Sequence, residues 1–130
     1  MNETAATAVS EFDVAVIGGA LSGAAAALLL RREDPALRIV VIEKNDAFKR
    51  RVGEATVEVS AYFLCRVLGL TQFLTQTQLT KNGLRFWFAN AGTKVLGDCS
   101  EIGGRYLSTV PSFLIDRSVV DEEVLRRAEE

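Results

Sequence analysis

The chain has 130 residues, of which 48% are hydrophobic and 25% are charged, and its formal net charge is −2. This composition suits one globular unit with a real core and offers no basic surface for nucleic acid. The chain has two widely spaced cysteines and no histidine. Two cysteines are too few ligands for a zinc site, and the absence of histidine excludes Ser–His and Cys–His catalytic pairs. We therefore expect no metal, reduced thiols and a cytoplasmic location.

The two ends of the chain differ in character. Residues 1–10 are small and polar and lack the basic and apolar order of a signal peptide, so we expect a flexible leader. The longest apolar run, residues 23–30, is far shorter than the ~20 residues of a membrane span, which predicts a soluble protein with no membrane partner. A helical pattern at residues 119–130 has no glycine or proline stop. We therefore expect the sequence to end inside a domain, so that residues 11–130 are an incomplete portion of it.

The first elements predict a βαβ unit. Residues 12–17 form an apolar run directly before glycines, as in a strand that is buried on both faces of a parallel sheet. Residues 22–32 contain strong helix formers and are followed by Pro35, which disfavours a longer helix. A second apolar strand follows at residues 38–43. Strand, helix and strand in this order predict an α/β fold with a right-handed crossover.

The middle of the chain is predicted to be a loop and a second helix. Residues 44–55 are polar and charged, as in a loop. Residues 56–68 carry apolar side chains at helical spacing, and Gly69 is well placed to end that helix.

Short strands are predicted in the last third. The aromatic run at residues 84–89 is typical of a strand, and residues 93–96 are expected to pair with it in a hairpin. Another strand is predicted at residues 113–115, before the last helix. Phe86, Trp87 and Phe88 either line a substrate cavity or, as is more usual for aromatic side chains on a strand, lie in the core.

The turn at residues 18–23 is a candidate phosphate site. It matches the first and third glycines of a dinucleotide fingerprint, GxGxxG, but has Ala20 at the middle position. Gly18 would permit the tight turn, and Gly23 would allow the helix to pack closely on the strand. The methyl group of Ala20 is expected to push a phosphate outward or to require a local adjustment, with Gly19 restoring some freedom. Unpaired amides at the start of the helix can bind a phosphate.

Glu43 strengthens the nucleotide interpretation. It follows the fingerprint by about 20 residues, at the end of the second strand, where a carboxylate accepts hydrogen bonds from both ribose hydroxyls. A carboxylate there disfavours a 2′-phosphate, so FAD or NAD is favoured over NADP. The alternative is that the glycines form only a close-packed turn and that Glu43 is a solvated strand end.

Residues 51–56, Arg-Val-Gly-Glu-Ala-Thr, together with the fingerprint and the acid, resemble the flavin-dependent halogenases. These belong to the FAD-dependent monooxygenase-like oxidoreductases. The resemblance runs from about Asp13 to the C-terminus. It implies a Rossmann-like FAD/NAD(P)-binding fold, truncated here, with the beginning of a β-rich substrate-side region. In that family the Val-Gly-Glu loop lies along the flavin, so Gly53, Glu54 and Ala55 would be FAD neighbours. From the residues alone, Glu54 can also cap or precede the helix near Thr56.

Residues 81–88 are similar to a halogenase segment in which a lysine precedes a strand of basic and aromatic residues, and Lys81 falls on that lysine. In the family, reduced flavin and dioxygen generate the oxidant for halide, and hypohalous acid travels to the lysine beside an electron-rich substrate. The resemblance therefore implies that Lys81 is catalytic, since an ammonium group can donate hydrogen bonds to the oxidant. The alternative is a solvated lysine at a strand entrance.

Residues 112–125 resemble a segment of flavin hydroxylases and halogenases in which an arginine opens a helix. This implies that Arg117 approaches the FAD phosphate or ribose. The alternative is a surface ion pair with Asp121, worth a few tenths of a kcal/mol.

These inferences predict the N-terminal FAD-binding part of a halogenase-like oxidoreductase, which acts with reduced flavin, dioxygen and halide on a small, electron-rich molecule. A separate flavin reductase would supply reduced flavin, and this stretch alone would be inactive. Two alternatives stay open: an FAD-dependent hydroxylase or reductase of the same fold, and a stand-alone, non-catalytic nucleotide-binding module. The expected catalytic residue is Lys81. The expected cofactor-binding residues are Gly18, Gly19, Ala20, Ser22, Gly23, Glu43, Lys44, Arg51, Gly53, Glu54, Ala55 and Arg117.

Overall fold

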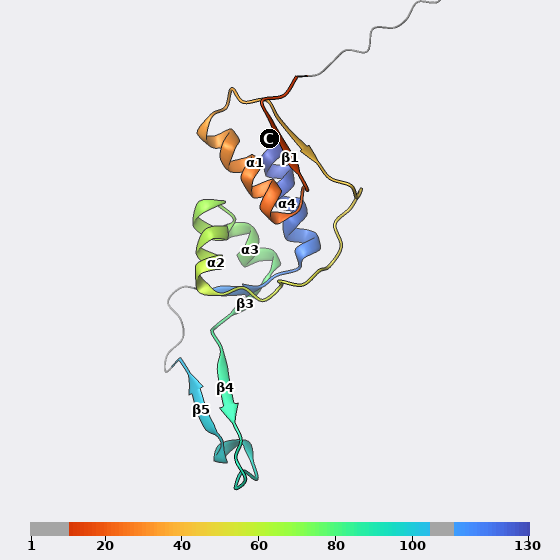
Figure 1. The fold of residues 1–130 in the computed structure, drawn as a ribbon. Coiled ribbons are helices and arrows are strands. Elements are labelled where there is room, and N and C mark those ends of the chain that lie inside the picture. The colour runs from red at the N-terminus through yellow and green to blue at the C-terminus, as the bar shows by residue number, and fades with distance from the viewer. Residues whose placement is uncertain (1–10, 105–110) are drawn as a thin grey trace, which may run out of the picture. The chain divides into compact units, whose positions relative to one another are not determined.

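The computed structural model describes residues 11–104 and 111–130, so the leader expected at residues 1–10 lies outside the described residues. The chain divides into two compact units (Figure 1). The first unit consists of Met1–Lys49 and Ser118–Glu130, and the second of Arg50–Arg117.

The first unit contains the predicted βαβ arrangement. Strand β1 (Val14–Ile17) leads into helix α1 (Leu21–Glu33), and strand β2 (Ile39–Ile42) returns beside β1. The two strands are parallel, with Val14 opposite Ile39 and Ile17 opposite Ile42. Helix α1 packs against both strands. The expected α/β fold with a Rossmann-like βαβ unit is confirmed.

The expectation that residues 12–17 are buried on both faces is wrong. Side chains along β1 alternate between half-buried and exposed, and Ile17 is 79% exposed. Within the described residues the sheet of β1 has two strands, and α1 packs against both. Since successive side chains of a strand point to opposite faces, one set faces the helix and the other set faces outward.

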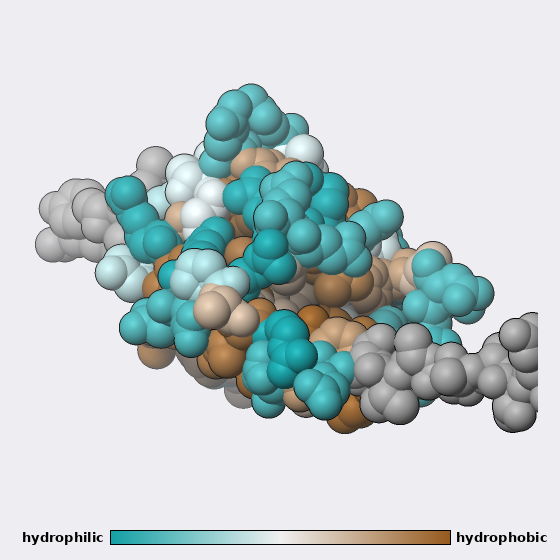
Figure 2. Space-filling model, turned by 90° about the horizontal axis from the view of Figure 1, so that it is seen from above, coloured by the Kyte–Doolittle hydropathy of each residue, from teal (hydrophilic) through white to brown (hydrophobic). Residues whose placement is uncertain are grey.

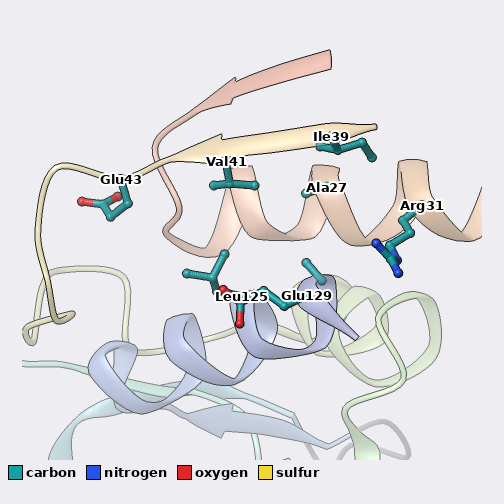
Figure 3. A pocket seen from close by; sticks show the side chains of 8 residues that line it. Ala27, Arg31, Ile39, Val41, Glu43, Leu125 and Glu129 are labelled. Carbon is teal, nitrogen blue, oxygen red and sulfur yellow. The ribbon is translucent and has the colours of Figure 1, made fainter. Parts of the chain in front are cut away.

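Helix α4 (Arg117–Glu129) brings the end of the chain back to this unit. It begins two residues before the predicted start at residue 119. Val120 and Val124 on α4 are fully buried, as is Ala24 on α1. Figures 1 and 3 both show α4 running beside α1.

The second unit contains a group of short helices. Helix α2 (Glu58–Tyr62) continues into a π-helical turn at Phe63–Val67, which confirms the helix predicted over residues 56–68. Gly69 follows with a φ of +76°, as expected of a residue that ends a helix. Helix α3 (Thr71–Thr77) was not predicted, because it is rich in threonine, a poor helix former. It is stabilised by tertiary packing, since Leu70 and Leu74 are fully buried.

A small antiparallel sheet lies beside these helices. Strand β3 (Leu79–Lys81), which was not predicted, pairs with β6 (Ser112–Leu114), one residue earlier than the predicted strand at residues 113–115. On its other edge β6 pairs with the segment around Ala55, which bridges to Leu114. The end of the predicted loop at residues 44–55 therefore contacts the edge of this two-stranded sheet through a single β-bridge.

The aromatic strand is β4 (Arg85–Phe88), and its partner is β5 (Ser100–Gly103). The predicted pairing with residues 93–96 is wrong. The Asp98 carboxylate accepts hydrogen bonds from the amides of Lys94 (3.0 Å) and Val95 (3.2 Å), and a short 3₁₀ turn follows at Leu96–Asp98. Side-chain acceptors thus take the amides that a strand would have needed.

The aromatic side chains of this hairpin are not core residues in the described part of the chain. Phe86, Trp87 and Phe88 are 52%, 44% and 54% exposed. Figure 2 shows other apolar residues at the surface as well, as brown areas between teal ones. No helix within residues 11–104 and 111–130 is long and apolar enough to cross a membrane.

Candidate functional site

The glycine turn has the geometry that its sequence predicts. Gly18 adopts a φ of +95°, which L side chains rarely reach, and its amide donates to the Ile42 carbonyl at 2.8 Å. A Cβ atom on Gly23 would stand 1.8 Å from the Gly18 oxygen and 3.1 Å from Val16 Cγ1. Only glycine therefore lets the helix approach the turn and strand this closely.

Ala20 fits the turn without any adjustment of the backbone. It precedes α1 with φ −68° and ψ −179°, an extended conformation open to any residue. The first helical hydrogen bond runs from the Ala24 amide to the Ala20 carbonyl at 2.9 Å. The amides of Leu21, Ser22 and Gly23 come before it, so they have no acceptor within the helix and are suited to an anion. The Ser22 side chain is exposed.

Glu43 closes the turn from the end of β2. Its Oε2 accepts the Gly19 amide at 2.8 Å, and its Oε1 accepts the Asn45 amide at 3.1 Å and the Asn45 side-chain Nδ2 at 2.7 Å. These hydrogen bonds lower the pKa of Glu43, and the one from the Gly19 amide contributes most. The carboxylate is therefore an ionised acceptor that stands against the glycine turn. Lys44, the next residue, is exposed.

Asn45 was not predicted as a site residue. Its position two residues after Glu43, where asparagine commonly forms local turns, was the signal available in the sequence.

A cavity of about 310 Å³ lies between α1, β2 and α4 in the first unit (Figure 3). Figure 3 shows Leu125 of α4 directed towards Val41 of β2, with Glu43 at the strand end. The walls combine aliphatic side chains with one cation and two carboxylates. The lining residues are Ala27, Arg31, Ile39, Val41, Glu43, Leu125, Ala128 and Glu129.

In the second unit, Gly53 and Glu54 lie beside Arg117. Gly53 has a φ of +93°, and a Cβ atom there would stand 3.2 Å from Arg117 Nη1. Glu54 Oε1 accepts a long hydrogen bond of 3.4 Å from the Arg117 amide at the start of α4, and Arg117 Nη1 donates to the Val52 carbonyl at 3.4 Å. Asp121, the alternative partner of Arg117 in a surface ion pair, is fully buried. The structure thus joins two predicted site segments that are 63 residues apart.

The other predicted site residues of this segment, Arg51 and Ala55, lie on either side of Gly53 and Glu54 in the sequence. Ala55 is exposed and pairs with Leu114, and Arg51 is exposed just before Val52. Arg50, which was not predicted, forms an ion pair of 2.8 Å with Asp116, and this contact raises the pKa of Arg50.

Lys81 lies at the end of β3 and is only half-buried, but its amine is not simply solvated. Its Nζ donates to the Thr56 carbonyl at 2.6 Å. Thr56 directly follows the Gly53-Glu54-Ala55 segment, so the structure brings the predicted catalytic lysine against the predicted flavin segment. Within the described residues, no group of three or more His, Cys, Asp or Glu could hold a metal ion.

A family model described as tryptophan halogenase matches residues 13–109. The chain belongs to the tryptophan halogenase family. A curated relative of this halogenase-family chain is the flavin-dependent halogenase chlA of Dictyostelium discoideum, which is 27% identical over 128 residues. The match covers 91% of this chain and 21% of the relative, so the chain spans about a fifth of that relative's length.

Solved structures with the same fold include further halogenases. The myxobacterial chondrochloren halogenase CndH matches with a TM-score of 0.72 and 23% identity, over 91% of this chain and 26% of its own. The flavin-dependent brominase Bmp2 matches with a TM-score of 0.72 and 21% identity, over 92% and 27%. The halogenase PltM, solved with phloroglucinol and FAD, matches with a TM-score of 0.69 and 18% identity, over 92% and 26%. These comparisons do not favour the hydroxylase, reductase or stand-alone module.

Proposed function

We propose that this chain is the N-terminal, FAD-binding part of a flavin-dependent halogenase, and thus of an oxidoreductase. The observation that carries the proposal is the hydrogen bond from the Gly19 amide to Glu43 Oε2, 2.8 Å long, beside the first amides of α1, which have no acceptor within the helix. In support of the proposal, this hydrogen bond joins the glycine turn after β1 to an acid at the end of β2, and a dinucleotide site requires amides for the phosphate and an acid for the ribose at adjacent strand ends. Family membership narrows the dinucleotide to FAD.

The residues of the first unit fit the adenosine half of FAD. The amides at Leu21 to Gly23 suit the pyrophosphate, since the helix start adds partial positive charge there. Glu43, ionised and acceptor-only, suits the ribose hydroxyls and would repel a 2′-phosphate. The aliphatic walls of the cavity beside it suit a flat heteroaromatic ring.

The second unit supplies the flavin-side residues of the proposal. Gly53 adopts a positive φ, which favours glycine, and because glycine has no side chain its backbone is exposed there, with the positive charge of Arg117 next to it. Arg51, Glu54 and Ala55 stand in the same segment. FAD, when bound, supplies the redox chemistry by which dioxygen and halide yield the halogenating oxidant.

Lys81 is the proposed catalytic residue. Its Nζ gives one hydrogen bond to Thr56, and a lysine ammonium has three hydrogens. Two donors therefore remain to hold hypohalous acid beside an electron-rich small molecule. In support, among residues 11–104 and 111–130 the Nζ makes this one short hydrogen bond and no ion pair with a carboxylate.

Three broader features belong to the same proposal. Residues 11–130 are part of an FAD-binding domain, a separate flavin reductase supplies reduced flavin, and the protein acts in the cytoplasm. The two cysteines are free thiols, which agrees with a reducing compartment.

Binding of FAD tests the first half of the proposal. Glu43→Gln removes the carboxylate that would accept hydrogen bonds from the ribose hydroxyls. The affinity of the full-length protein for FAD should therefore fall roughly tenfold or more. Fluorescence titration with FAD measures the change. Glu33→Gln, at the other end of α1, is the matched control and should bind as the wild type does. Equal affinity of the Glu43 variant would contradict the assignment.

Turnover measurements test the second half of the proposal, the catalytic role of Lys81. Lys81→Ala should abolish halogenation by the encoded protein while reduced flavin is still consumed, because the amine acts after the flavin. Product formation and flavin oxidation are measured in the same reaction. Lys94→Ala, in the exposed hairpin loop, should leave both unchanged. Undiminished halogenation by the Lys81 variant would overturn the catalytic assignment.

A further inference from the structure

Two buried residues hold Lys81, one at each end: the Thr56 carbonyl accepts a hydrogen bond from the Lys81 amine, and the Ser112 hydroxyl donates one to the Lys81 carbonyl. Thr56 is 6% exposed and Ser112 is 1% exposed. We infer that Thr56 and Ser112 are positioning residues that fix the Lys81 amine for its reaction. The inference rests on the proposed catalytic role of Lys81.

Thr56 is fixed by three hydrogen bonds to a single residue. Its hydroxyl donates to the Phe113 carbonyl at 2.8 Å and accepts the Phe113 amide at 2.7 Å. Its own amide also donates to the Phe113 carbonyl, at 2.9 Å. Phe113 is 1% exposed and lies on β6, so Thr56 is tied to the core of the second unit. The remaining polar group of Thr56, its carbonyl, accepts Lys81 Nζ at 2.6 Å.

Ser112 fixes the other end of the lysine. It stands opposite Lys81 in the β3–β6 pair, and its hydroxyl donates to the Lys81 carbonyl at 3.0 Å. The main chain and the amine of Lys81 are therefore both anchored to β6, the amine through Thr56. A lysine side chain has high rotamer entropy, so these anchors reduce the freedom that a reactive amine would otherwise have to lose on turnover.

These hydrogen bonds also hold the Lys81 amine next to the segment that contains Glu54. Thr56 is two residues beyond Glu54, and the Glu54 carbonyl accepts the Ile115 amide at 2.7 Å on the same edge of β6. Lys81 Nζ is consequently held at a constant place along the proposed flavin segment. A loosened Thr56 would leave the lysine present but misplaced, so the oxidant would form without efficient transfer to substrate.

Chemical modification of Lys81 tests this without requiring turnover. In the encoded protein, cyanate modification of Lys81 is followed by peptide mass spectrometry. Thr56→Val keeps the shape but removes the hydroxyl, which should release the amine and raise the modification rate severalfold. Thr56→Ser keeps the hydroxyl and should restore the wild-type rate. Thr80→Val is the matched control, because Thr80 is the exposed neighbour of Lys81 on β3.

Ser112→Ala is the second variant and decides the outcome if Thr56→Val does not fold. It should also raise the Lys81 rate. In turnover, both variants should yield less product per reduced flavin at an unchanged rate of flavin oxidation, which a general loss of structure would not give. A wild-type rate of Lys81 modification in a folded Thr56→Val or Ser112→Ala protein would overturn the inference, as would an equal rise in Thr80→Val. Absence of halogenation by the wild type would refute the proposed function instead, and the cyanate reaction distinguishes the two failures.

Discussion

At the scale of single residues, an ion pair between Asp13 and Arg38 connects the residues that precede β1 and β2. The Asp13 carboxylate accepts hydrogen bonds from the Arg38 amide (2.9 Å), Nε (3.1 Å) and Nη2 (3.0 Å). The side-chain hydrogen bonds of Arg38, followed by that of its amide, lower the pKa of Asp13 from 3.8 to about 2. Because the folded pKa is the lower one, this contact stabilises the fold above pH ~4 and is lost as the pH falls towards 2.

Replacement of Arg38 tests that assignment. Arg38→Gln should raise the pKa of Asp13 part of the way to 3.8, since the backbone amide of residue 38 still donates to the carboxylate. NMR titration of the Asp13 side-chain carboxyl measures it. Arg66→Gln, in the second unit, is the control and should leave that pKa at about 2. An unchanged Asp13 pKa in the Arg38 variant would show that the guanidinium does not cause the shift.

At the scale of elements, β6 organises the second unit. It pairs with β3 on one edge and with the segment around Ala55 on the other. Phe113 at its centre is 1% exposed, with Leu64, Leu68 and Leu74 buried in the same unit. The residues expected to act in halogenation are thus held by a strand that carries no proposed catalytic group.

Truncation of Phe113 should therefore destabilise the protein strongly. Phe113→Ala is expected to cost about 3–5 kcal/mol, through lost burial and the cavity left behind. Val59→Ala removes an apolar side chain that is 76% exposed on α2, and should change stability by no more than about 0.5 kcal/mol. Urea unfolding followed by circular dichroism compares the two. Similar midpoints for both variants would show that Phe113 is not a core residue.

The sequence predicts some elements much better than others. The βαβ unit depends on neighbouring residues and on one close approach, that of Gly23 to Gly18, so local patterns suffice. Helix α3 and strand β3 depend on packing and on pairing with β6, more than thirty residues away, and local propensity does not contain that information. The partner of β4 was mispredicted because Asp98 captures nearby amides, which only the folded loop shows.

At the scale of the whole molecule, each of the two units exposes apolar side chains among its described residues. Ile17, Val52, Val59 and Leu79 are each at least 70% exposed, and the aromatic hairpin is about half exposed. Neighbouring exposed apolar side chains, such as the aromatic ones of β4, are a liability for association.

The 130-residue chain expressed by itself should consequently bind a hydrophobic dye and self-associate. Replacing Phe86 and Phe88, which share one face of β4, by threonine keeps strand propensity and should reduce both effects. Dye fluorescence and analytical ultracentrifugation measure them. A Thr93→Ser variant, in the hairpin loop, controls for substitution as such. A monomer that binds no dye would contradict this expectation.

The sequence by itself determined the parallel βαβ unit and the candidate residues on either side of its glycine turn. These features need only hydrophobic periodicity, glycine at sterically restricted positions and an acid at a strand end. Tertiary structure decided which candidates meet. It joins Glu43 to Gly19, Arg117 to Glu54 and Lys81 to Thr56, across 24, 63 and 25 residues of chain.

The tertiary structure also shows the roles of residues that the sequence analysis did not name as site residues. Asn45 holds Glu43, and Thr56 and Ser112 hold Lys81, through hydrogen bonds that form only once strands and turns are in register. The physical reason is that a hydroxyl or amide in a sequence has many potential partners. Once such a group is buried beside one particular strand, a single set of hydrogen-bond partners is available to it, and it must pair with them because a buried unpaired polar group would cost free energy.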